Sequence, residues 1–485
     1  MKIFDKDKIL NKFEKFEISN HLDKKILFGV YWWDVLRVPI YENLILRLKK
    51  KKLYKSYESK NLNKLNNFYV ILKKVYLYFF LFFKTFSPNS PIWIKKDSYI
   101  VFGHPRRLLV NKIYIDKYTD PFLELFNNNK KFCVIEKPLN DIIRFPNSLA
   151  HYKPTITKNL FYGESLFFLF FIFKIFLRFK ISKDKLNELN FINKDFKKRF
   201  KLNINLLKKI FHILPNFKSE YYVYRLLFKI KKPKKIFIIC SPGFEAIIAA
   251  AKSLNIQTYE LQHGSPSRGK LNYDYSSGIS KFSFPDYFLS FGSFWTRNIK
   301  LPISDKNIIP IGFPYLNKKR NLKLKKLNQL LIISQIGKSK ELINFALKIR
   351  KILSKKINII FKLHPSENIN DIEYLLENLK KKKITVIKDK SSDLYKYLSE
   401  SKWILGVYST SLYEALVFNC NIFVLKVSGY EFMKKFIEKD YFTLVYNAKE
   451  LLKKIMSNKK KNKFKKSINF IFNQKTKKNI KLIKF

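Results

Sequence analysis

The sequence contains little glycine, few cysteines and a small share of acidic residues. Glycine accounts for 12 of 485 residues and cysteine for three, and 37 Asp and Glu face 97 Lys and Arg. The cysteines, Cys133, Cys240 and Cys420, are too far apart to form a metal-binding spacing, and as free thiols they suit a reducing compartment. The sequence also lacks Gly-x-Gly-x-x-Gly, Walker, Gly-x-Ser-x-Gly and His-Glu-x-x-His motifs. Their absence disfavours dehydrogenases, P-loop enzymes, α/β-hydrolases and zinc proteases.

Long apolar runs are missing as well. The first residues, MKIFDKDKILNKFEKFE, have no apolar core of the kind that a signal peptide carries. Two aromatic runs, VYLYFFLFF (75–83) and LFFLFFIF (166–173), are far shorter than the roughly 18 apolar residues of a spanning helix. They are interpreted either as buried helices of an N-terminal domain or as helices that dock onto an anionic membrane surface. We expect a cytoplasmic protein, with a peripheral location on the inner face of the plasma membrane as the alternative.

The charge that is present is strongly positive. The formal net charge is +60, and 12 arginines are found beside 85 lysines. The excess of lysine and the abundance of Asn, Ile and Phe are typical of a gene with A/T-rich codons. This composition favours the interpretation that most of the charge lies on solvated faces and has no specific partner. The alternative is attraction to an anionic surface of phospholipid or nucleic acid. Nucleic acid is the weaker partner, because neither zinc-finger spacing nor an RNP box is present.

Where glycine is scarce, each one that is kept indicates a demand of the backbone. Nine of the 12 glycines follow residue 240, and several of them come where a strand is predicted to end. The second half of the chain is therefore the predicted place where the backbone meets a ligand.

Apolar strands alternate with amphipathic helices over most of the chain. Strands are predicted at 98–103, 132–136, 235–241, 257–261, 286–292 and 307–314, and then at 329–335, 357–365, 384–388, 403–409 and 421–427. Continuous apolar strands separated by helices predict parallel sheets covered on both faces. We predict an α/β protein with a helical N-terminal extension (1–95), a Rossmann-like domain (96–316) with a helical insertion (about 155–232), a second Rossmann-like domain (327–456) and a basic C-terminal helix or tail (457–485).

Polar clusters follow four of the predicted strands. They are Gly103-His104-Pro105-Arg106-Arg107, Gln262-His263-Gly264, Lys362-Leu363-His364-Pro365 and Tyr408-Ser409-Thr410-Ser411. In open parallel sheets ligands bind beyond the carboxyl ends of the strands, so we expect these clusters to face a cleft between the two domains.

The polar clusters in the second half of the chain favour the binding of a phosphate group. Ser409, Thr410 and Ser411 open a helix whose free N–H groups and dipole suit a phosphate, although plain N-capping explains them too. Glu414 lies one turn further, where it could bind ribose hydroxyls or remain a surface carboxylate. Lys362, His364 and Pro365 end a strand, where Lys or His could neutralise a leaving diphosphate, or simply close the loop.

The polar clusters in the first half of the chain favour the binding of an acceptor substrate that carries a hydroxyl group. His263 could take a proton from a hydroxyl near neutral pH, and Gly264 lets a substrate approach the backbone, although His263 could equally cap its strand. Glu245 and Asp274 are the nearby carboxylates that could orient His263 or replace it as base. Gln262, Arg268, His104 and Arg106 are candidates for binding the acceptor, with a plain strand stop as the alternative for His104 and a solvated loop charge as the alternative for Arg268. No Asp-x-Asp follows a strand, which favours a reaction without a metal and without a cofactor.

With these residues in place, the chain resembles the bacterial GT-B glycosyltransferases of capsule and surface polysaccharide synthesis. The resemblance lies in LQHG (261–264), PDYFLSFG (285–292), IGFPYL (311–316), KLHPSE (362–367) and VYSTSLYEAL (407–416). The Lys-x-His-Pro and Ser/Thr motifs are similar to those of bacterial sialyltransferases and polysialyltransferases, and the His-Gly and His-Pro pair to those of CDP-glycerol glycerophosphotransferases. The similarity covers residues 235–440 well and 27–140 loosely, and the acidic base of the sialyltransferases has no identified counterpart here.

The resemblance implies a GT-B-like fold and an inverting transfer from a nucleotide-activated sugar to a hydroxyl of a growing glycan. It implies that His263 acts as base and that His364, Ser409 and Thr410 contact phosphate. Three alternatives remain open: CDP-glycerol-type transfer of a phosphoalcohol, a nucleotide-sugar 2-epimerase, and a basic, non-catalytic adaptor for membrane or nucleic acid.

Overall fold

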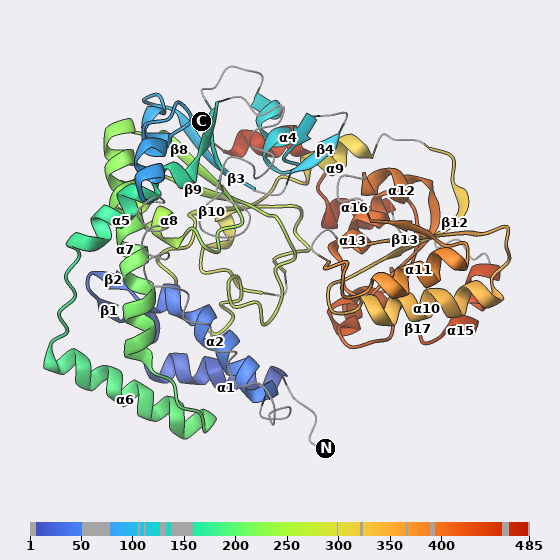
Figure 1. The fold of residues 1–485 in the computed structure, drawn as a ribbon, viewed down its shortest axis with the longest axis horizontal. Coiled ribbons are helices and arrows are strands. Elements are labelled where there is room, and N and C mark those ends of the chain that lie inside the picture. The colour runs from blue at the N-terminus through green and yellow to red at the C-terminus, as the bar shows by residue number, and fades with distance from the viewer. Residues whose placement is uncertain are drawn as a thin grey trace.

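The computed structural model describes residues 6–50, 78–104, 107–110, 113–126, 132–136, 159–297, 299–320, 324–364, 367–388, 393–457 and 465–483. Figure 1 shows two α/β bodies side by side, one built mainly from the first 320 residues and one from the rest. No described helix is long and apolar enough to cross a bilayer.

The first body contains a parallel sheet of seven strands in the order β11-β10-β9-β8-β3-β6-β7. Its strands are β3 (Tyr99–Gly103), β6 (Phe132–Glu136), β7 (Leu160–Tyr162), β8 (Lys235–Ile239), β9 (Thr258–Leu261), β10 (Tyr287–Ser290) and β11 (Ile308–Pro310). The chain starts at β3, adds strands on one side and then returns to add β8 on the other. The switch point, where a ligand is expected, therefore lies between the ends of β3 and β8.

The second body contains a parallel sheet of six strands in the order β14-β13-β12-β15-β16-β17. Its strands are β12 (Leu327–Ile333), β13 (Asn358–Lys362), β14 (Thr385–Ile387), β15 (Ser401–Gly406), β16 (Asn421–Leu425) and β17 (Thr443–Val445). This is the Rossmann strand order, with its switch point between β12 and β15. Two parallel sheets of this kind confirm the predicted α/β class with two Rossmann-type domains.

Both sheets are covered on both faces, because their strands alternate between two apolar surfaces. In β3, Ile100 and Phe102 pack against α5, α7 and α8, whereas Tyr99 and Val101 face α4 and the C-terminal segment. The helices of the first body are α1 (Lys6–Ser19), α2 (Trp33–Lys50), α4 (Thr119–Leu123), α5 (Phe167–Phe176), α6 (Lys183–Phe200), α7 (Leu206–Lys231), α8 (Glu245–Lys252) and α9 (Pro314–Lys319). Short antiparallel pairs are formed by β1 (Ile26–Leu27) with β2 (Val30–Tyr31), and by β4 (Leu108–Val110) with β5 (Ile113–Ile115).

The second sheet is enclosed in the same way. Its helices are α10 (Ser339–Ile352), α11 (Glu373–Lys381), α12 (Leu394–Glu400), α13 (Thr410–Val417), α14 (Lys434–Glu438) and α15 (Ala448–Met456). Helices α10, α11 and α15 cover one face and α12 and α13 the other.

The predicted N-terminal extension and the predicted insertion form one helical unit. Phe13 and Phe16 of α1 and Trp33 of α2 share an apolar cluster with Phe196 of α6 and Ile210 of α7. Figure 1 shows these helices together below the first sheet. Segments about 180 residues apart in sequence thus make one core, since neither helix pair could bury its apolar face alone.

The end of the chain ties the two bodies together. Helix α16 (Lys465–Ile471) packs on the second body, with Ile468 in its apolar cluster, whereas Ile480 and Ile483, beyond α17 (Thr476–Asn479), enter the core of the first sheet. Between them, Asn473 N–H donates to the carbonyl of Phe291 at 2.7 Å. The basic tail of the prediction is, over 465–483, a strap across both domains.

Candidate functional site

The carboxyl edge of the first sheet brings two of the predicted histidines together. His104 follows β3 and His263 follows β9, with only β8 between these strands. Their imidazole rings stack with centroids 4.9 Å apart and an interplanar angle of 20°. β8 ends level with β9, Ile239 pairing with Leu261, so the residues that follow β3 and β9 emerge at the same edge of the sheet.

The loop after β3 supports this pair from one side. The carboxylate of Asp116, which is buried, accepts the backbone N–H of His104 at 2.9 Å and that of Tyr118. The Tyr118 hydroxyl donates to the carbonyl of His263 at 3.0 Å, and its ring packs 5.6 Å from the His263 ring. His263 is therefore positioned by Tyr118 through both its backbone and its ring.

Gln262 and Gly264 shape the turn that carries His263. The Gln262 side chain is buried, donates to the Gly264 carbonyl at 2.7 Å and accepts the N–H of Phe291 at 2.7 Å. Its role is to fix the turn against β10, which differs from the acceptor contact predicted for it. A side chain at Gly264 would meet no atom within 4 Å, so crowding within the protein does not require glycine there.

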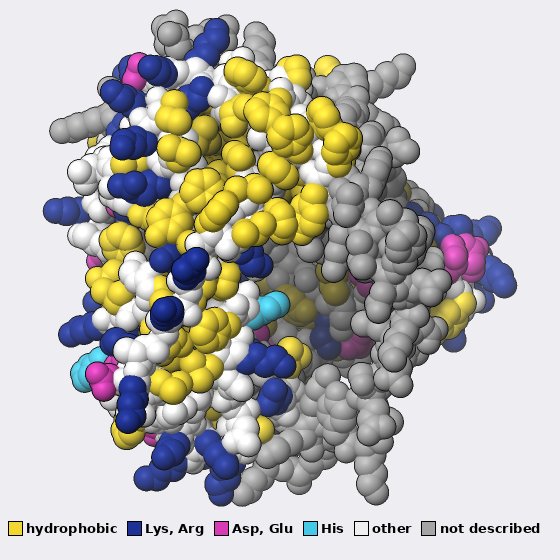
Figure 2. Space-filling view, turned by 60° about the vertical axis from the view of Figure 1, so that its left-hand side comes forward, with side chains coloured by type: hydrophobic (Ala, Val, Ile, Leu, Met, Phe, Trp, Pro, Cys, Tyr) yellow, Lys and Arg dark blue, Asp and Glu magenta, His cyan; other side chains and the backbone are white. Residues whose placement is uncertain are grey.

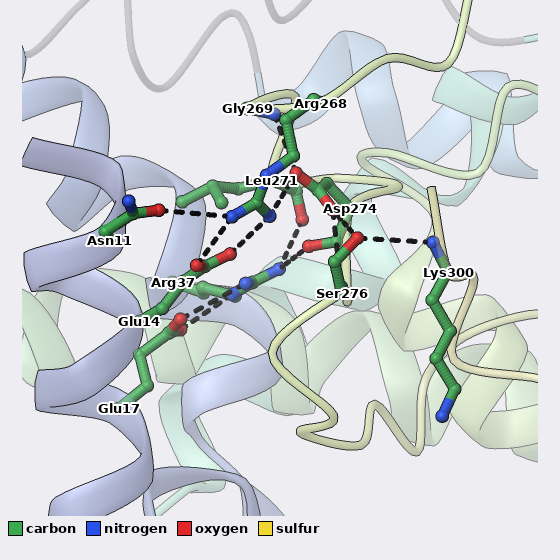
Figure 3. A network of polar contacts seen from close by, with 10 residues as sticks. All are labelled: Asn11, Glu14, Glu17, Arg37, Arg268, Gly269, Leu271, Asp274, Ser276 and Lys300. Carbon is green, nitrogen blue, oxygen red and sulfur yellow. Dashed lines mark hydrogen bonds and ion pairs between the residues drawn. The ribbon is translucent and has the colours of Figure 1, made fainter. Parts of the chain in front are cut away.

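Two other candidates of the first half, Arg268 and Asp274, belong to the network of Figure 3. The buried Asp274 carboxylate accepts from Arg268 at 2.9 Å, from Gly269 N–H at 2.7 Å and from the Ser276 hydroxyl at 2.6 Å. Arg268 also pairs with Glu14 of α1. These contacts anchor the loop after His263 to the helical unit, and they engage the carboxylate that was predicted as a base, Asp274, and the guanidinium that was predicted to bind the acceptor, Arg268.

Glu245, the first residue of α8, has a similar structural role. Its carboxylate accepts the N–H of Gly243 at 2.9 Å and pairs with the buried Lys281 at 3.2 Å. Glu245 therefore closes the turn after β8 and holds the 280–283 segment. Arg106 and Pro365 lie outside the described residues, and their predicted roles remain predictions.

The phosphate candidates gather at the carboxyl edge of the second sheet. Ser409 caps α13, its hydroxyl accepting from Ser411 N–H at 3.3 Å, which is the capping role that was the alternative. Thr410 is exposed and Ser411 half-buried in the first turn. His364 follows β13, and Lys362 is the last residue of that strand.

The switch point of this sheet adds a loop that the sequence motifs did not single out. Residues 334–338 connect β12 to α10, and the Ile336 carbonyl accepts from the Tyr408 hydroxyl at 3.4 Å. Glu367 of the KLHPSE motif accepts from the Ser339 hydroxyl at 2.5 Å. Gly337 has a φ of 73°, which favours glycine, so its retention in a glycine-poor chain was the available signal.

Lys117 and Tyr118 connect the two edges. Tyr118 and Leu108 pack against an apolar cluster that contains residues of both bodies, and the Tyr118 ring stacks on Phe313 of the first body with centroids 5.4 Å apart. Burial by itself lowers the pKa of Lys117, but the Tyr118 hydroxyl and the Glu414 carboxylate of α13 raise it above its ordinary value. Glu414 is buried, so the alternative of a surface carboxylate is wrong, and its ribose contact stays a prediction. No sequence motif pointed to Lys117.

The molecule also contains hollows, one of which lies away from these residues. Figure 2 shows a hollow beside a broad apolar area, with a histidine side chain at its rim. A cavity of about 390 Å³ is lined by Phe294, Phe436 and Phe470 among others, and none of the predicted site residues lines it. Among the described residues, no group of three or more His, Cys, Asp or Glu is arranged to hold a metal ion.

Comparisons with known proteins give distant structural neighbours. No known protein-family profile and no curated protein matches the chain. The UDP-GlcNAc 2-epimerase from Methanocaldococcus jannaschii is 13% identical, with a TM-score of 0.46 over 80% of this chain and 99% of that one. The enzyme of the same name from Neisseria meningitidis is 12% identical, with a TM-score of 0.45 over 80% and 100%. The wall teichoic acid polymerase TagF is 14% identical, with a TM-score of 0.42 over 88% and 97%.

Proposed function

We propose that this protein is a GT-B-type glycosyltransferase that moves a sugar from a nucleotide-activated donor, for example a CMP-linked one, to a hydroxyl of a growing surface polysaccharide. The nucleotide would lie on the second domain and the glycan or lipid-linked glycan acceptor on the first. The structural neighbours described above have TM-scores below 0.5 and are less than 25% identical to this chain. The support for the proposal therefore comes from the residues of this chain.

One observation carries the proposal: two strand-end clusters of complementary chemistry meet through one loop. His104 and His263 stack at the edge of the first sheet, and α13 opens with Ser409, Thr410 and Ser411 at the edge of the second. Tyr118 contacts His263 directly and packs against an apolar cluster formed by residues of both domains, and its neighbour Lys117 interacts with the Glu414 carboxylate of α13. A base on one side and a phosphate cradle on the other is the arrangement that group transfer between two bound substrates needs.

The proposed reaction is a direct displacement. The acceptor oxygen forms a bond to the anomeric carbon while the bond from that carbon to the donor phosphate breaks. His263 takes the proton of the acceptor hydroxyl, and the departing phosphate is stabilised by His364, Lys362 and the N-terminal turn of α13. Attack opposite the leaving group inverts the anomeric centre, and neither a metal nor a cofactor takes part in this scheme.

A panel of nucleotides tests the binding half of the proposal. We expect at least one of CMP, CDP, UDP and GDP to raise the melting temperature of the full chain. His364→Ala should reduce that shift because it removes a phosphate contact, whereas His212→Ala, a change at an exposed histidine of α7, should not. The absence of a shift with every nucleotide would favour a non-catalytic adaptor and overturn the proposal.

The donor that responds then separates the enzyme classes. A shift with CMP alone favours a sialic-acid-like sugar, and consumption of CDP-glycerol would reassign the protein to the phosphoalcohol transferases. An epimerase built on Glu245 or Asp274 is disfavoured by their contacts with Lys281, Arg268 and Ser276. With the responding donor, His263→Ala should lower turnover about 10²- to 10⁴-fold while nucleotide binding is retained. A variant of full rate would place the base elsewhere.

A further inference from the structure

The helix formed by residues 78–85 exposes aromatic side chains and buries polar ones. Phe82 and Phe83 are 41% and 57% exposed, whereas Lys84 and Thr85 are 9% and 2% exposed. Water favours the opposite arrangement, because apolar surface is the part that gains from burial. Among the described residues, none covers the apolar side of this helix in the way that a soluble domain normally does.

Buried polar contacts hold the helix in this orientation. The Lys84 ammonium pairs with the buried Glu164 carboxylate at 3.4 Å. The Thr85 hydroxyl donates to the Ser165 carbonyl, or to the Leu81 carbonyl of its own helix, at 2.9 Å. Because turning the helix over would break the pairing of a buried charge, the aromatic side is fixed toward the outside.

Helix α5 extends the same surface. Its sequence is FFLFFIFKIF, and none of its residues is buried. Phe168 packs against Phe82 at 5.3 Å and Phe171 against Tyr78 at 4.0 Å between ring centroids, so the two helices lie side by side. The interpretation of the aromatic runs as buried helices is thus wrong for Phe79, Phe82 and Phe83 of the first run, which are exposed, whereas residues 167–173 of the second run are half-buried and several of them pack on the core of the first domain.

The aromatic face is the set of strongly exposed apolar residues on and next to these helices. Its members are Phe79, Phe82, Phe83, Phe86, Trp93, Ile175 and Phe176, with exposed fractions between 41% and 77%. Figure 2 shows a broad apolar area on this side of the molecule, with Lys and Arg side chains along its border. Monomeric soluble proteins rarely keep so large a contiguous apolar area without a partner.

Charge around the aromatic face indicates what the partner is. Residues 78–96 and 167–182 contain six Lys or Arg and no Asp or Glu. All of these basic residues except Lys84 are exposed. Phe and Trp beside a basic border suit the boundary between acyl chains and anionic headgroups, where rings enter the apolar layer and ammonium groups remain at the phosphates.

We propose that the aromatic face docks the protein onto an anionic phospholipid bilayer, with α5 and the 78–85 helix lying in the interface. The docking is peripheral. It does not depend on the transferase activity, and a bound membrane would bring the acceptor-side domain to the surface where lipid-linked substrates reside.

Tryptophan fluorescence offers a local readout of this docking. Trp93 is 56% exposed and belongs to the aromatic face, whereas Trp32, Trp33, Trp295 and Trp403 are all buried. On addition of vesicles of phosphatidylcholine and phosphatidylglycerol, we expect the emission to shift to the blue and to be quenched by brominated acyl chains. Trp93→Phe should abolish both changes while the protein still binds.

Vesicle flotation with the full chain then tests the face itself. Phe83→Ser with Phe176→Ser should weaken binding at least about tenfold, because two rings no longer enter the bilayer. The matched control changes Phe191 and Tyr374 to Ser, which are 68% and 63% exposed on α6 and α11, and should bind like the unaltered protein. Vesicles of phosphatidylcholine alone should bind much more weakly than the anionic mixture.

Three results would overturn the proposal. Equal binding by the Phe83/Phe176 variant would show adsorption through the overall net charge. Absence of binding to either kind of vesicle would exclude a lipid partner. Self-association that this variant abolishes, without vesicle binding, would make the aromatic face an interface between copies of the chain. Each result leaves the nucleotide panel unaffected, so the membrane proposal and the proposed function fail separately.

Discussion

Replacing Arg37 by Met should destabilise the helical unit and release the loop after His263. Arg37 is 1% exposed. Its guanidinium donates to both oxygens of Glu17, at 2.7 and 3.1 Å, and to the carbonyls of Leu271 at 2.7 Å and Asp274 at 3.0 Å. Figure 3 shows it between α1 and that loop. One buried side chain therefore joins elements more than 230 residues apart.

The magnitude follows from what the substitution leaves behind. Glu17 would remain buried without its cation, which costs about 3–5 kcal/mol. Burial already raises the pKa of Glu17 above its ordinary value, against the lowering effects of Arg37 and Trp33. Without Arg37 the carboxyl would take up a proton more readily, which limits the loss. Each carbonyl left without a donor adds about 1–3 kcal/mol unless water reaches it, so we expect a total loss of at least about 3 kcal/mol.

Urea unfolding measures this loss through Trp33, whose indole N–H donates to Glu17 at 2.7 Å. Arg199→Met is the control, because Arg199 pairs with Asp195 on the partly exposed surface of α6 and should contribute less than about 1 kcal/mol. Amide exchange in residues 264–283 should accelerate in the Arg37 variant alone. If Arg37→Met costs no more than Arg199→Met, the buried pair does not hold the loop, and the reasoning fails.

Two further predictions concern Glu260 and the C-terminal strap. Burial raises the pKa of Glu260 to about 7, so the folded state binds its proton more tightly than the unfolded state does. Its contribution to stability is present below about pH 4.5 and is lost as the pH rises through about 7, a change of about 3 kcal/mol. Glu260→Gln should remove that part of the pH dependence. If the free energy of unfolding changes equally with pH in both proteins over this range, the burial effect is contradicted. Gly312 has a φ of 84°, and a β-carbon there would collide with the carbonyl of Asn473. Gly312→Ala should lower the melting temperature and open the strap to proteolysis, whereas Gly278→Ala, with a φ of 87° and open space, should show only the backbone strain of about 1–2 kcal/mol. Equal effects of the two substitutions would show that the strap does not depend on this contact.

The strands and their order of appearance were predictable because a parallel strand buried on both faces is apolar throughout. The predicted strand 132–136 coincides with β6, and the others differ from the structure by a few residues at their ends. The short strands β1, β2, β4, β5, β7 and β17 were missed, since strands of two or three residues carry little periodic signal.

The site was predictable in part for a related reason. His104, His263, His364 and Ser409 follow strands, and parallel sheets place such residues at one edge. The sequence could not show that Arg268 pairs with Glu14, 254 residues away, or that Asp274 accepts from its own loop. A charged loop residue available to a ligand and one held by a distant helix look the same in a linear sequence.

The sequence by itself determined the two parallel sheets and the polar clusters at their edges, because periodicity and strand ends are local properties of the chain. Tertiary structure alone decided that β8 lies between β3 and β9, so that His104 meets His263, and that Tyr118 reaches both His263 and the apolar cluster that the two domains share. It also decided that Phe79, Phe82 and Phe83 of the first aromatic run face outward, since the buried Lys84–Glu164 pair fixes which side of their helix is covered. Such choices depend on contacts between residues far apart in sequence, whose energies are set only when the elements are packed.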